Sequence, residues 1–88
     1  MSRVERIRSL LQAALDPQVL LVTDDSHRHV GHAGAADGRG HFNVEIVSEV
    51  FAGKVSLARH RAIYAALAGM MDTDIHALSI MARAPDEV

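Results

Sequence analysis

Residues 41–47 have the sequence HFNVEIV, in which apolar and polar side chains alternate. Every second residue from Phe42 to Ile46 is apolar, and Asn43 and Glu45 stand between them. Successive side chains point to opposite faces of a β-strand, so this alternation predicts a strand with one buried face. Such a strand needs further apolar elements against that face, and the neighbouring segments supply them.

Two other segments predict strands that accompany this one. Residues 18–24 form a short run rich in valine and leucine, which is bounded by Pro17 and a polar cluster and is typical of a buried strand. Residues 76–83 alternate in the same way as residues 41–47. The alternation places four side chains on one face of this last strand: His76, Leu78, Ile80 and Ala82.

The first helix is predicted over residues 3–15, where apolar side chains recur at helical spacing. Ser2 and Glu5 have the spacing of a capping box at its start. The helix is expected to end at Asp16, because a residue that precedes proline avoids the α region.

A second helix is predicted over residues 57–71, with Ser56 as its N-cap and Gly53 in the turn before it. Its expected apolar stripe consists of Leu57, His60, Tyr64, Leu67 and Met71, widened by Ile63 and Met70. Residues 25–40 contain four glycines and predict a long loop, and residues 84–88 resemble a tail.

The resulting order is α-β-β-α-β, which predicts the α+β class. Both helices are expected on one face of a three-stranded mixed sheet, as a two-layer α/β sandwich. The 88 residues allow one domain, residues 1–88. No apolar run approaches the roughly 20 residues that span a bilayer, and a cytoplasmic protein is the expectation.

Composition disfavours several functions. The formal charge of −2 leaves no general surplus of positive charge for nucleic acid, so any such site must be a local patch. The chain has no cysteine, and no G-x-S-x-G turn presents a serine nucleophile. The short pattern Gly38-Arg39-Gly40 lacks the strand and helix that flank a phosphate-binding loop. These observations argue against an enzyme.

Histidine is the one residue type with an unusual distribution. Three of the six histidines, His27, His29 and His32, lie within six residues of the predicted loop. Imidazole is a common metal ligand, but this spacing does not supply the four ligands of a closed metal site. Taken alone, the cluster is therefore more typical of a polar loop, and His76 of a residue at the edge of a strand.

Several motifs taken together resemble the BolA family over about residues 4–84. They are Ser26-His27-Arg28-His29, His41-Phe42-Asn43-Val44, Val47-Ser48, Phe51-Ala52-Gly53, Arg59-His60-Arg61-Ala62-Ile63-Tyr64 and Ile75-His76-Ala77-Leu78. The family's fold resembles the class II KH domain, and its order agrees with the α-β-β-α-β order derived from the patterns above.

The resemblance implies a non-enzymatic partner of a monothiol glutaredoxin in iron–sulfur or iron homeostasis or redox regulation. In such pairs a [2Fe–2S] cluster is shared with the glutaredoxin cysteine and with glutathione. The family's principal ligand matches His76, and its loop ligand matches His29, with His32 and His27 close enough to compete for that role. Alone, such a chain is expected to be a monomer or a weak homodimer.

The resemblance also implies an alternative function, since some BolA proteins are described as DNA-binding transcriptional regulators of morphology and the stress response. The corresponding surface here would comprise Arg59, Arg61 and Lys54. The turn that ends at Lys54 lacks the G-x-x-G phosphate clamp of true KH domains.

Overall fold

Three strands form a mixed sheet in the computed structural model, which describes residues 1–26 and 38–88. Strand β2 lies in the middle, antiparallel to β1 and parallel to β3. The order α-β-β-α-β is confirmed, with the second predicted helix divided in two. The elements are α1 (Arg3–Leu15), β1 (Val19–Asp24), β2 (Gly40–Val47), α2 (Ser56–Ala66), α3 (Ala68–Met71) and β3 (Ile75–Arg83), with short 3-10 turns η3 (Glu49–Phe51) and η4 (Pro85–Glu87).

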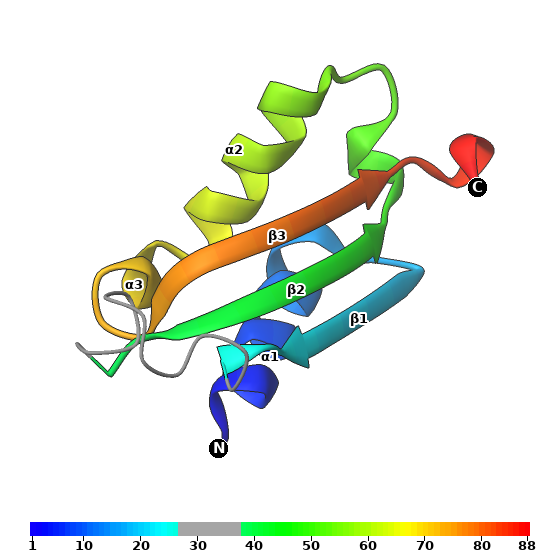
Figure 1. Cartoon of the computed structure of the whole chain (residues 1–88). Coiled ribbons are helices and arrows are strands. Elements are labelled where there is room, and N and C mark those ends of the chain that lie inside the picture. Colours follow the sequence, from blue (N-terminus) through cyan, green and yellow to red (C-terminus); the bar gives the residue numbers. More distant parts are fainter. Residues whose placement is uncertain (27–37) are drawn as a thin grey trace.

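Both long helices pack on the same face of the sheet (Figure 1). From β2, the side chains of Phe42, Val44 and Ile46 point to this face, and each is 1% exposed. They form one core with Ile7 and Leu11 of α1 and with apolar side chains of the other elements. Burial of a side chain of this size contributes about 1.5–3 kcal/mol, so this layer holds the helices on the sheet.

Helix α1 has the predicted bounds, because local interactions define both of its ends. The Ser2 hydroxyl accepts the backbone N–H of Glu5 at 3.1 Å and caps the first turn. At the other end, Asp16 adopts a left-handed conformation with φ of 44°. Aspartate tolerates this conformation better than most residues, and the helix stops there.

The second predicted helix begins one residue earlier and is interrupted. Val55 occupies the N-cap position without a side-chain hydrogen bond, and Ser56 is already helical, so the prediction of Ser56 as N-cap was wrong. Leu67 leaves the regular helical conformation, with φ of −102° and ψ of 11°, and separates α2 from α3. Gly53 has φ of +74°, as the predicted tight turn requires.

The buried face of the second helical region agrees only in part with the predicted stripe, because Ile63, Leu67 and Met70 are buried as predicted and other members are not. Leu57 is 59% exposed and Tyr64 is 39% exposed, whereas Arg59 and Ile63 are buried. The buried row is one residue away from the predicted His60–Tyr64 row, which is a rotation of about 100°. The predicted stripe did not include Arg59, whereas the fold buries this arginine and gives it partners.

Those partners form a C-terminal clasp, which we define as Arg59, Ala84 and Glu87. The Arg59 guanidinium donates to both Glu87 carboxylate oxygens, at 2.5 and 2.7 Å, and to the Ala82 carbonyl at 3.1 Å. Ala84 is fully buried, and its N–H donates to Glu87. The prediction of a tail at residues 84–88 was therefore wrong, because the chain end is attached to α2.

Because of the C-terminal clasp, we expect the free energy of unfolding to fall when Glu87 is protonated in acid. Hydrogen bonds from Arg59 first, and then from the Ala84 N–H, lower the pKa of Glu87 from 4.5 to about 2. A lowered folded-state pKa adds stability above the unfolded value, and this stability is lost as the pH falls toward 2. We expect Glu87→Gln to unfold at lower urea concentration than wild type at pH 7, with the gap closing between about pH 4.5 and pH 2.

The control for this measurement is Asp86→Asn, which removes the same charge from the neighbouring exposed position. Urea midpoints of the three proteins across this pH range provide the comparison. A gap between wild type and Glu87→Gln that stays constant down to pH 2 would show that the carboxylate does not carry the effect.

Candidate functional site

His76 is an extra residue in the pairing of β3 with β2. Gly40 pairs with Ile75 and His41 pairs with Ala77, so His76 lies between two successive pairs. Such a bulge changes the direction in which a side chain points. His76 is exposed, whereas Leu78, Ile80 and Ala82 pack against the core. The prediction that all four share one face was therefore wrong for His76.

The bulge brings His76 beside His41 in β2 and beside Arg39, which directly precedes this strand. The rings of His41 and His76 lie with centroids 5.2 Å apart and planes tilted by 39°. Arg39 Nη2 donates to His76 Nδ1 at 3.2 Å, and Arg39 Nη1 lies 3.5 Å from the Met71 carbonyl. We call His76, His41 and Arg39 the histidine site.

Asp74 positions both strands that carry the histidine site. Its carboxylate accepts from Arg3 Nε at 3.2 Å and from Arg6 Nη1 at 3.3 Å, which ties the turn before β3 to α1. Its carbonyl accepts the Gly40 N–H at 2.9 Å and so joins the starts of β3 and β2. A hydrogen bond from Thr73, and then the positive charge of Arg6, lower the pKa of Asp74 below its ordinary value.

Gly40 allows a close approach at the same place. The Ser26 hydroxyl accepts the His41 N–H at 3.0 Å, just beside Gly40. A Cβ atom on Gly40 would lie 2.6 Å from Ser26 Oγ and 2.8 Å from the Phe42 ring. Since the Phe42 ring is buried, the backbone at the start of β2 would have to move.

We therefore expect Gly40→Ala to destabilise the fold by about 1–3 kcal/mol, as overpacking does elsewhere. The matched control is Gly69→Ala in α3, where an added Cβ meets nothing within 4 Å. Because alanine favours a helix, the control should be stabilised by about 0.5–1 kcal/mol. Urea unfolding measures both, and equal stability of Gly40→Ala and wild type would contradict the packing argument.

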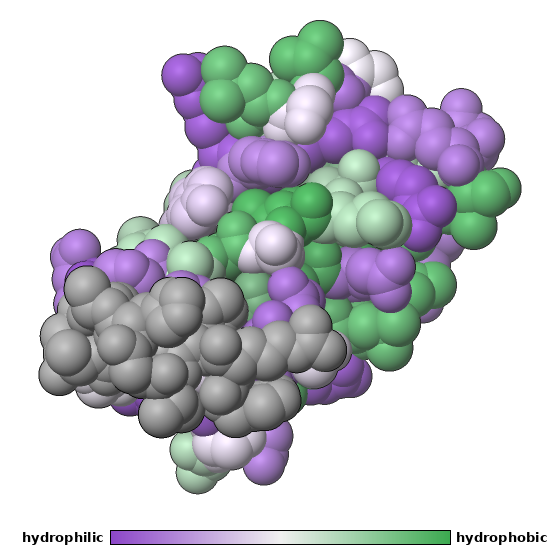
Figure 2. Space-filling view, in the orientation of Figure 1, coloured by the Kyte–Doolittle hydropathy of each residue, from purple (hydrophilic) through white to green (hydrophobic). Residues whose placement is uncertain are grey.

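A hollow of about 310 Å³ borders the histidine site on the sheet face away from the helices. It is lined by Asp25, His41, Phe42, Asn43, Ala77, Leu78 and Ser79. On this face, Figure 2 shows apolar side chains interspersed with polar ones. Leu21, Glu45 and Met81 pair across the three strands, and Leu21 and Met81 are 55% and 49% exposed.

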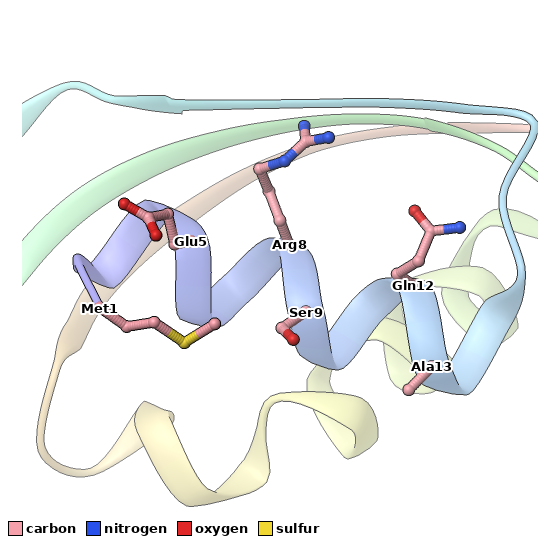
Figure 3. Close-up of a pocket in the computed structure, with 6 residues that line it drawn as sticks. All are labelled: Met1, Glu5, Arg8, Ser9, Gln12 and Ala13. Atoms are coloured by element: carbon pink, nitrogen blue, oxygen red, sulfur yellow. The ribbon is translucent and has the colours of Figure 1, made fainter.

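A larger surface groove, of about 450 Å³, lies along the solvent side of α1 (Figure 3). Its lining consists of Met1, Glu5, Arg8, Ser9, Gln12 and Ala13. The Arg8 side chain extends toward β1, where it donates to the Leu20 carbonyl at 2.8 Å. No residue of the histidine site contributes to this groove.

Comparison with known proteins decides the family. The family model described as BolA-like protein matches residues 11–87, which is most of the chain. The chain belongs to the BolA family. It is similar in structure to BolA1 from Arabidopsis thaliana, with a TM-score of 0.86, 39% identity and coverage of 100% of this chain and 98% of the other.

Two curated relatives illustrate the range of names within the BolA family. "SufE-like protein 1, chloroplastic/mitochondrial" of Arabidopsis thaliana is 49% identical over 99% of this chain, which spans 25% of that relative's length. "DNA-binding transcriptional regulator BolA" of Escherichia coli strain K12 is 45% identical over 86% of this chain and 70% of the relative. A BolA-like sequence therefore occurs both as most of a protein and as part of a longer one.

The predicted site residues of this BolA chain lie in different environments in the structure. His76 is exposed at the bulge. His29, His32 and His27 lie outside the described residues. The guanidinium of Arg59 belongs to the C-terminal clasp, while Arg61 and Lys54 are exposed. The structure thus separates Arg59 from the basic surface that the DNA-binding alternative requires.

Sequence patterns did not identify His41 or Arg39 as members of the histidine site. His41 was assigned to a strand and Arg39 to a loop, and neither has a motif that points to His76. Arg39 lies 37 residues from His76 along the chain, and their contact depends on the parallel pairing of β2 with β3. Only a register prediction that included the bulge could have found it.

In the part of the chain that the structure describes, no helix is long and apolar enough to cross a membrane. The cytoplasmic location stays a prediction, since one relative carries chloroplastic/mitochondrial in its name. Cell fractionation would test it.

Proposed function

We propose that this BolA protein is a non-enzymatic partner of a monothiol glutaredoxin, to which it contributes the imidazole of His76 for a shared [2Fe–2S] cluster. The observation that carries the proposal is the exposed His76 ring at the β3 bulge, which contacts Arg39 and His41. An exposed ligand on a rigid strand is accessible to a second protein.

The donor set of the chain fits a shared cluster. Iron–sulfur clusters are held mainly by thiolates, and this sequence contains no cysteine. Thiolates would therefore come from the glutaredoxin and glutathione, and this chain would add neutral imidazole. Bound there, a [2Fe–2S] cluster would supply one-electron redox chemistry, at a potential that imidazole ligation raises. His29 remains the proposed second ligand, with His32 and His27 as alternatives.

The role of this chain is then to dock and to orient the His76 imidazole, with the loop histidine as a second ligand. Docking is proposed to involve α2 and the exposed edge of β3, on which His76 lies. The physiological context would be iron–sulfur or iron homeostasis, or redox regulation, in which a shared cluster is passed on or sensed.

A second candidate function is DNA-binding regulation, and the name of the Escherichia coli relative favours it. Arg61 and Lys54 would carry this function without Arg59, whose guanidinium is engaged inside the fold. Because the formal net charge is −2, this surface would have to be a local basic patch.

One experiment separates the two candidates. The chain is titrated into a glutathione-loaded monothiol glutaredoxin that carries its [2Fe–2S] cluster, and visible absorption and circular dichroism are recorded. The proposal expects a new spectrum that saturates at one chain per glutaredoxin. An unchanged spectrum together with salt-sensitive binding to duplex DNA would instead support the regulator function.

A further inference from the structure

The hydrogen bond between Arg39 and His76 determines where the imidazole proton lies. A guanidinium has five N–H donors and no acceptor. Since Arg39 Nη2 lies 3.2 Å from His76 Nδ1, Nδ1 must be the acceptor in this contact. A neutral imidazole that accepts at Nδ1 carries its proton on Nε2.

Neither ring nitrogen of His76 is then ready to bind a metal. The lone pair of Nδ1 points at Arg39, and Nε2 carries the proton. Binding through Nδ1 requires the guanidinium to leave. Binding through Nε2 requires the proton to move to Nδ1, where it would face an N–H of Arg39. Both routes break the same hydrogen bond.

Arg39 is a hydrogen-bond donor, whereas the usual neighbour of a metal-bound histidine is an acceptor. Such a histidine normally donates its second ring N–H to a carboxylate, a carbonyl or water. Arg39 offers a donor at that position, and its other amino group lies 3.5 Å from the Met71 carbonyl at the end of α3. The guanidinium is therefore located between α3 and β3 while the chain is alone.

We propose that Arg39 is a positioning residue that holds His76 in a non-ligating state and must release it before metal is bound. The inference rests on the proposed function, because it describes how the same imidazole becomes available. Removing the donor should make ligation easier without adding any contact to the cluster.

The first measurement concerns the tautomer in the chain alone. Histidine labelled with ¹⁵N is observed by long-range ¹H–¹⁵N correlation at about pH 8, where an ordinary imidazole is neutral. Wild type is expected to hold the His76 proton on Nε2. Arg39→Glu supplies an acceptor in place of the donor and should move the proton to Nδ1. A wild-type His76 protonated at Nδ1 would overturn the proposal.

The second measurement is affinity for the cluster-loaded glutaredoxin. Loss of one competing hydrogen bond should make Arg39→Met bind about fivefold more tightly than wild type. Arg39→Lys keeps a donor without an acceptor and should return the Kd toward the wild-type value. If Arg39→Met and wild type bind equally, Arg39 does not restrain His76.

His76→Ala distinguishes this failure from failure of the proposed function. If His76→Ala forms the same cluster spectrum as wild type, the imidazole is not a ligand, and the role of Arg39 is rejected with it. If His76→Ala loses the spectrum while Arg39→Met keeps the wild-type Kd, the shared cluster stands and only the role of Arg39 is rejected.

Discussion

Replacing His76 by alanine is expected to abolish the cluster spectrum that forms with cluster-loaded glutaredoxin, while the fold is retained. The ring is exposed at the β3 bulge and lies outside the hydrophobic core, so its loss should change the free energy of unfolding by no more than about 0.5 kcal/mol. Alanine carries no donor atom for iron, and His76 is the only histidine in β3.

The control is Ser79→Ala, a smaller truncation to alanine at another exposed position of β3. It should retain the full spectrum. Far-ultraviolet circular dichroism and urea unfolding establish that both variants are folded, and titration with glutaredoxin that lacks the cluster separates docking from ligation. A His76→Ala protein with the wild-type spectrum would remove His76 from the proposed site.

The second large effect is expected on α2, where Ile63→Ala should destabilise the fold by about 2–5 kcal/mol. Ile63 is fully buried between the helices and the sheet, and its truncation leaves a cavity in the core. This is a large share of the roughly 5–15 kcal/mol that stabilises an ordinary domain.

Leu57→Ala is the control for this variant, because it removes a similar side chain from the same helix at a position that is 59% exposed. Its cost should stay within about 0.5 kcal/mol. The urea midpoints of the two variants therefore determine the orientation of α2. If Leu57→Ala were the more damaging change, Leu57 would lie on the buried face of α2, and the assignment of Ile63 to that face would be wrong.

Interactions within a few residues explain why the sequence predicted some elements well. The bounds of α1 depend on Ser2, Glu5 and Asp16, which act on their own turn of the chain. The middle strand depends on its alternating side chains, which appear in the structure as buried Phe42 and Ile46. Signals of this kind are contained within a few residues, so the order of elements, the mixed sheet and the position of His76 at the start of the last strand were predictable.

The features of the site and of the buried α2 face that the sequence did not reveal involve partners that are distant along the chain. Burial of Arg59 depends on Glu87, 28 residues later, and the turn before His76 depends on Arg3, 71 residues earlier. An arginine in an amphipathic helix is expected to face water unless a carboxylate elsewhere in the fold pairs with it.

The histidine site also combines features that local sequence predicts with features that depend on distant residues. The sequence by itself determined that this is an α+β chain of the BolA type, with a histidine opening its last strand and no cysteine of its own. Only the tertiary structure decided that a bulge turns His76 outward, beside His41, and that Arg39 occupies its Nδ1. The physical reason is that strand register and long-range hydrogen bonds arise from packing of the whole sheet, which no local pattern encodes.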